Sequence, residues 1–118
     1  TMANAAMPPI YHYSAKNKKL NEIEIVNLPL GGLSNEEYEL VQIEFDKEDL
    51  LIQLSDGLPE APNPTGDLID YDRLFECIEQ NAMKSPKDVV ESLVELAENW
   101  LDGNINPDDI TIVATKKV

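Results

Sequence analysis

The chain has 118 residues, and 42% of them are hydrophobic, which suffices for one domain with a modest core. It carries 23 acidic and 9 basic residues, and its formal net charge is −14 at pH 7. Such a negative surface argues against binding to nucleic acid or to an anionic membrane, because phosphate groups bind cationic proteins. A phosphorylated protein would be repelled in the same way unless bound metal cations reversed the local field.

The cysteine content and the hydropathy pattern indicate the compartment. The single cysteine, Cys77, lies in a helical pattern, so no disulfide framework points to an oxidising environment. No apolar run approaches the roughly 20 residues of a membrane-spanning helix, and no secretory signal is evident. We therefore expect a cytoplasmic protein that does not contact membranes.

The first predicted elements form a hairpin. Residues 10–13 and 22–26 are typical of two short strands, and the basic segment 16–19 between them is typical of a turn. Pro29 and the pair Gly31-Gly32 then interrupt the pattern. This part of the sequence predicts two antiparallel strands followed by a break.

Two further strands are predicted before the helical part of the chain. In residues 38–45, Val41, Ile43 and Phe45 alternate with polar residues, as in a strand with one buried face and one face in water. Residues 50–54 are apolar at nearly every position, which is typical of a central strand covered on both faces.

Two helices are predicted after a proline-rich loop, residues 59–67. The first spans residues 71–83, where apolar residues recur at helical spacing. The second begins at Ser85 as the N-cap, with Pro86 in the first helical position, and ends at Gly103. Its apolar stripe comprises Val89, Val90, Leu93, Leu96, Ala97, Trp100 and Leu101.

A last apolar strand, residues 110–114, follows the helices. This order of elements predicts an α+β fold, with a mostly antiparallel sheet and both helices on one face. The opposite face of the sheet, apolar at residues 50–54, would then require another layer of protein. That layer could come from elsewhere in a larger domain or from a second copy of the chain.

Two acidic motifs lie at the ends of predicted strands. Asp56-Gly57 follows the strand at 50–54, and Asp108-Asp109 precedes the last strand. If these strand ends meet at one edge of the sheet, their carboxylates could bind a hard cation such as Mg²⁺ or Mn²⁺, which prefers oxygen ligands. Either motif alone is better explained as an ordinary acidic turn. Gly57 is explained either by a turn or by the close approach of two backbone segments.

Four segments carry a resemblance to a known family. They are Ala3-Asn4-Ala5-Ala6-Met7-Pro8-Pro9, Leu28-Pro29-Leu30-Gly31-Gly32-Leu33, Ser55-Asp56-Gly57-Leu58-Pro59-Glu60-Ala61 and Pro107-Asp108-Asp109-Ile110-Thr111. In this order they resemble the metal-dependent protein phosphatases of type 2C. The bacterial branch typified by the sporulation stage II protein E phosphatase is the more similar, with its Thr-Asp-Gly-Leu-x-Glu-Ala and Asp-Asp-Ile-Thr motifs.

Two departures from the family pattern stand out. Ala6-Met7 replaces the Gly-His of the family's Asn-Ala-Gly-His-Pro-Pro segment. The Asp-Gly metal-binding motif that the family carries in the N-terminal half of its domain has no counterpart in this chain. The resemblance therefore implies that residues 1–118 are the C-terminal part of a phosphatase 2C-like domain and form half of an α-β-β-α sandwich.

The resemblance implies a function and a set of site residues. Asp56 and Asp108 match the family's metal ligands, so we expect them to hold Mn²⁺ or Mg²⁺, of which the intact domain binds a pair. The implied reaction is hydrolysis of phosphoserine or phosphothreonine in proteins of the anti-sigma-factor-antagonist type. Because half of the ligand set is missing, we expect the chain alone to have little or no activity.

Two other interpretations stay open on the sequence. The replacement of Gly-His by Ala6-Met7 is consistent with a non-catalytic regulatory or interaction domain that keeps the phosphatase-like fold. A free-standing small domain is the other alternative. Under all of these interpretations, including the phosphatase fragment, the uncovered apolar sheet face of the chain predicts self-association. His12, in the middle of a strand, is not expected to be catalytic.

Overall fold

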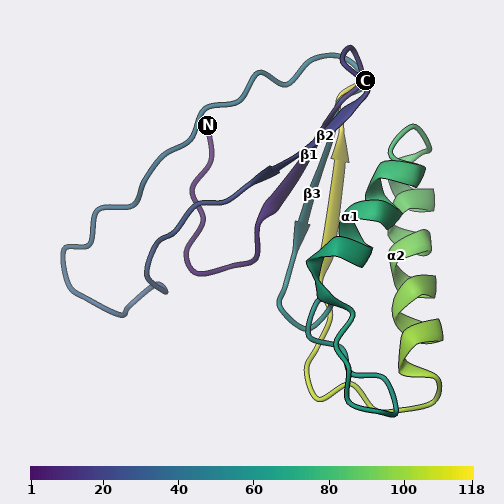
Figure 1. The fold of residues 1–118 in the computed structure, drawn as a ribbon. Helices are drawn as coiled ribbons and strands as arrows, with labels where there is room; N and C mark the ends of the chain where they lie inside the picture. Colours follow the sequence, from purple (N-terminus) through teal and green to yellow (C-terminus); the bar gives the residue numbers. More distant parts are fainter.

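A four-stranded antiparallel sheet and two helices make up the computed structural model, which describes residues 1–118 (Figure 1). The elements follow the chain as β1 (Ile10–Ser14), β2 (Lys19–Ile23), β3 (Leu50–Leu54), α1 (Asp70–Asn81), α2 (Pro86–Leu101) and β4 (Ile112–Lys116). The strands lie in the order β2-β1-β3-β4, and both helices lie on one face (Figure 1). The predicted α+β class is confirmed. Neither helix has the length and apolar character that crossing a membrane requires.

The core lies between the sheet and the helices. Tyr11 of β1 pairs with Ile52 of β3, and both are completely buried. The ring of Tyr11 meets Phe75 of α1 edge to face, with the ring centroids 6.3 Å apart, so this face of the sheet points at the helices. The helices bury apolar residues at helical spacing against it: Leu74 and Ile78 from α1, and Val89, Leu93 and Ala97 from α2.

The prediction that residues 50–54 are covered on both faces was wrong within this chain. Leu50, Ile52 and Leu54 are buried against the helices, whereas Leu51 is half-buried and Gln53 is exposed. The alternation arises because both helices pack on the same side of β3. The other face of the sheet has no layer of helices.

The strand predicted at residues 38–45 does not form. One isolated antiparallel bridge, Met2 to Val41, is the only β pairing in this segment. Its side chains still alternate, with Val41, Ile43 and Phe45 half-buried and the residues between them exposed. A strand needs a neighbour that satisfies its backbone groups, and residues 24–48 instead run in a long excursion away from the sheet (Figure 1).

The helix α2 follows its local signals closely. Ser85 has an extended backbone, its hydroxyl accepts a hydrogen bond from the Asp88 amide at 3.2 Å, and Pro86 is the first helical residue. The last helical residue is Leu101; the C-cap residue Asp102 has a positive φ of 45°, and Gly103 after it has a positive φ of 82°. These are the predicted start and stop of the helix.

Candidate functional site

The end of β3 lies against the approach to β4. The Ser55 amide donates to the Thr111 carbonyl at 3.0 Å, and the Thr111 amide donates to the Ser55 hydroxyl at 2.9 Å. The Ser55 hydroxyl also donates to the Asp109 carbonyl at 3.3 Å. These three bonds bring the segments that carry Asp56 and Asp108 to the same edge of the sheet. The role of the two aspartates as metal ligands stays a prediction.

Gly57 allows these two segments to touch. A Cβ atom built on Gly57 would overlap the carbonyl oxygen of Asp109 and lie 2.9 Å from its carbonyl carbon and 3.5 Å from that of Asp108. Its backbone is not among those with a positive φ, so a left-handed turn does not explain the glycine. Of the two explanations drawn from the sequence, the structure supports close approach.

The Asp56 side chain is exposed and lines an open hollow of about 520 Å³. Glu22, Glu24 and Glu60 also line this hollow, together with apolar residues of the N-terminal segment, Ala6, Met7, Pro8 and Pro9. The residues Ala6-Met7, which replace the family's Gly-His, therefore line the same hollow as the candidate ligand Asp56. Glu60 is exposed within the same hollow.

The Asp108 side chain bonds to the backbone of the next residue. Its Oδ1 accepts a hydrogen bond from the Asp109 amide at 2.8 Å, and the carboxylate is exposed at the surface. Asp108 does not line the hollow at Asp56, and nowhere in the chain do three or more His, Cys, Asp or Glu side chains gather into a group that could hold a metal ion. The chain therefore offers oxygen donors on two adjoining segments, but not a complete ligand set.

The charge around Asp56 is strongly negative. Burial raises the pKa of Tyr71, and the carboxylates of Glu60, Asp56, Glu22 and Glu24 raise it further. Tyr71 lines the same hollow, so the field of these four groups acts on one side chain there. This field attracts cations and repels phosphate in their absence.

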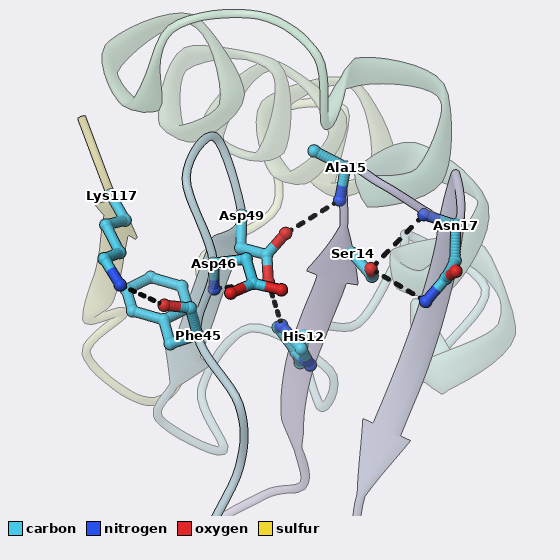
Figure 2. Close-up of polar contacts among 8 residues, drawn as sticks. All are labelled: His12, Ser14, Ala15, Asn17, Phe45, Asp46, Asp49 and Lys117. Atoms are coloured by element: carbon cyan, nitrogen blue, oxygen red, sulfur yellow. Dashed lines mark hydrogen bonds and ion pairs between the residues drawn. The ribbon is translucent and has the colours of Figure 1, made fainter.

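A second polar cluster lies at the opposite end of β3, around Asp49 (Figure 2). His12 Nε2 lies 3.0 Å from Asp49 Oδ2, and the amides of Ala15 and Asp46 donate to the same carboxylate at 2.8 and 3.0 Å. Burial alone would raise the pKa of Asp49, which is 2% exposed, but these hydrogen bonds outweigh it and hold the pKa below its ordinary value.

Sequence reasoning did not single out Asp49. It lies directly before an apolar strand in an acidic turn, and nothing in that pattern distinguishes a buried carboxylate from a solvated one. β3 separates Asp49 from Asp56, so the pair of His12 and Asp49 is not part of the candidate metal site. Through its contact with Asp49, His12 links β1 to the start of β3.

Comparison with known proteins identifies the family. Residues 1–117 match Stage II sporulation protein E (SpoIIE). The chain is 27% identical over 118 residues to Phosphoserine phosphatase RsbU of Bacillus subtilis, covering all of this chain and 35% of RsbU. It is 23% identical over 111 residues to Protein IcfG of Synechocystis, covering 94% of this chain and 17% of IcfG. The chain thus spans only a part of the length of these relatives.

Solved structures share the fold. The SiaA-PP2C domain of Pseudomonas aeruginosa has a TM-score of 0.75 at 16% identity, covering 92% of this chain and 42% of that one. The PP2C phosphatase domain of SpoIIE from Bacillus subtilis, solved with a fragment of its regulatory domain, has a TM-score of 0.72 at 23% identity, covering 97% and 33%. The Mn-presoaked SpoIIE phosphatase domain has a TM-score of 0.70 at 18% identity, covering 96% and 48%. The chain belongs to the SpoIIE family and has a PP2C-like fold.

Proposed function

We propose that the chain is the C-terminal part of a metal-dependent protein phosphatase domain that hydrolyses phosphoserine or phosphothreonine in cytoplasmic proteins. The observation that carries this proposal is the contact of Gly57 with the Asp108-Asp109 backbone, which brings two acidic strand ends together. Membership of the SpoIIE family supports it, as does the similarity to RsbU, which is named a phosphoserine phosphatase.

The donor atoms at this edge fit a hard cation. Asp56 and Asp108 present exposed carboxylates, and Glu60 lies in the same hollow as Asp56. Mg²⁺ and Mn²⁺ prefer oxygen ligands and keep several waters. Two carboxylates on adjoining segments therefore suit these ions better than they would suit Zn²⁺, which favours nitrogen and sulfur ligands. Asp56 and Asp108 would hold the Mn²⁺ or Mg²⁺ ions, a pair in the intact domain. When bound, such ions supply Lewis acidity and neutralise phosphoryl charge.

Residues of the chain itself hold the two acidic segments in place and orient them. Ser55 and Gly57 fix the relative position of the two acidic segments, and the surrounding carboxylates concentrate cations in an otherwise repulsive site. No group of three or more metal-binding side chains is assembled in the chain, so water or residues of another segment would have to complete the coordination shell. We therefore propose that the 118 residues alone have little or no activity. A phosphorylated protein of the anti-sigma-factor-antagonist type is the proposed substrate.

A non-catalytic regulatory or interaction domain is the second candidate. Ala6 and Met7 line the hollow at Asp56, so the departure from the family's Gly-His falls at the candidate site rather than far from it. In this case the acidic edge would be a remnant of a catalytic fold. The contacts of the domain with other proteins would carry its function.

Hydrolysis by the complete protein separates the two candidates. With Mn²⁺ and a phosphoserine protein as substrate, we expect activity that Asp56→Ala abolishes without loss of the fold, because an exposed ligand contributes little to the core. Glu95→Ala is the matched control, since Glu95 is an exposed carboxylate on α2. A complete protein that hydrolyses no phosphoserine substrate with any divalent metal would favour the regulatory domain.

A further inference from the structure

The side chain of Asn106 contacts both acidic segments of the candidate site. Its Nδ2 donates to the Gly57 carbonyl at 2.9 Å, and its Oδ1 accepts from the Asp108 amide at 3.5 Å, which is the longer and weaker contact. Gly57 is buried and Asn106 is half-buried. One carboxamide therefore bridges the residue after Asp56 and the backbone of Asp108 itself.

The segment around Asp108 depends on side chains for its position. β4 begins only at Ile112, and residues 105–110 make no hydrogen bond from backbone to backbone. The amides of Asp108 and Asp109 are bonded to the side chains of Asn106 and Asp108 instead. Ser55 fixes the side of this segment nearer to β4, and Asn106 fixes the side nearer to α2.

We propose that Asn106 is a positioning residue, which holds the Asp108 turn against Gly57 and thereby sets the separation of the candidate ligands Asp56 and Asp108. This inference rests on the proposed function. A carboxamide suits the task because it offers a donor and an acceptor together and adds no charge beside the carboxylates. A displacement of a ligand by a fraction of an ångström weakens a metal site, so the contacts of Asn106 should affect the affinity for the metal.

Asn104 provides a matched control on the same loop. Its Nδ2 donates to the carbonyls of Pro62 and Asn63, both at 3.3 Å, and it has no hydrogen bond to Gly57 or Asp108. Asn106→Ala and Asn104→Ala each remove a bridging carboxamide of the same type from the same connection. Only the first removes a contact to the segments that carry the candidate ligands.

The test is a Mn²⁺ titration of the 118-residue chain, in which free Mn²⁺ is measured by electron paramagnetic resonance. We expect Asn106→Ala to weaken Mn²⁺ binding by about ten-fold or more, as loss of a residue that orients a ligand does. We expect Asn104→Ala to bind Mn²⁺ like the unsubstituted chain. Spectra of the backbone amides of both variants verify the fold. If Asn106→Ala does not fold, Asn106→Ser replaces it, because the serine side chain is too short to bridge the two segments.

Three outcomes would overturn the inference, and they have different meanings. Equal Mn²⁺ affinity of folded Asn106→Ala and Asn104→Ala would show that Asn106 does not position the ligands. Binding lost in Asp56→Ala but retained in Asn106→Ala would leave the proposed metal site intact and remove only the role of Asn106. Absence of Mn²⁺ binding by the unsubstituted chain would contradict both the proposed metal site and the positioning role of Asn106.

Discussion

Gly57 lies directly against the carbonyl group of Asp109, without room for a Cβ atom between them. The neighbour is backbone held by Ser55, so it cannot move aside as a flexible side chain would. This contact joins the end of β3 to the turn before β4 and so links the two acidic motifs.

Gly57→Ala should therefore push the Asp108-Asp109 turn away from β3. We expect a loss of about 1–3 kcal/mol in the free energy of unfolding, as for other overpacked sites, together with weaker Mn²⁺ binding. Urea denaturation measures the first effect. Gly32→Ala is the control, because its Cβ would lie 3.2 Å from the Pro29 carbonyl oxygen and 4.0 Å from Pro29 Cδ, without overlap, in an exposed segment. Equal stability of the two variants would contradict the close contact at Gly57.

The carboxylate of Asp49 should make the stability of the chain depend on pH under acidic conditions. The pKa of Asp49 is lowered in the folded chain from its ordinary value of 3.8, so the unfolded chain binds the proton more readily. The stabilisation is complete above this value and is lost as the pH falls below it, through the lower pKa of the folded state. Thermal unfolding measured from neutral pH down to about pH 2.5 would show the loss.

Asp49→Asn removes this part of the acid dependence. We expect it to lower the free energy of unfolding at neutral pH by about 2 kcal/mol, because a buried charge-assisted acceptor of three hydrogen bonds is replaced by a neutral amide. Asp46→Asn is the control, since the exposed Asp46 contributes its backbone amide to the cluster and not its carboxylate. A variant Asp49→Asn with the stability and acid profile of the unsubstituted chain would show that the cluster does not stabilise the fold.

The uncovered face of the sheet should make the chain associate with itself. On this face Leu51 is half-buried, Gln53 is exposed and Val113 of the edge strand β4 is 48% exposed, while both helices cover the other face. We expect sedimentation equilibrium to show association that increases with protein concentration. Val113→Lys should reduce it, and Met83→Lys, at an exposed site between the helices, should not. A monomer at all concentrations would contradict the prediction that the face of the sheet opposite the helices drives self-association.

Local signals explain which parts of the fold were predictable. The limits of α2 follow from Ser85, Pro86 and Gly103, which act on the backbone next to them. The strand at 38–45 was predicted wrongly, because alternation of side chains describes a surface but does not supply the neighbouring strand. The last strand begins at Ile112 rather than at 110. The backbone just before Ile112 bonds to Ser55, the residue after β3, and is not part of the ladder between β3 and β4.

The candidate site was predictable in outline only. The residue types and the strand ends pointed to Asp56 and Asp108, and the structure places their backbones on adjoining segments. Asn106 and Asp49 were not foreseen, because their partners Gly57 and His12 lie 49 and 37 residues away in the sequence. Hydrogen bonds over such separations depend on the completed fold and leave no local pattern.

Calorimetric titration of the chain with Mn²⁺ tests the central claim most directly. We expect binding at millimolar or weaker affinity, because water must fill the places of the missing ligands. Asp56→Ala and Asp108→Ala should each weaken that binding by about ten-fold or more, and Glu95→Ala, an exposed acid on α2, should leave it unchanged. Equal Mn²⁺ binding by all four proteins would contradict a metal site formed by Asp56 and Asp108.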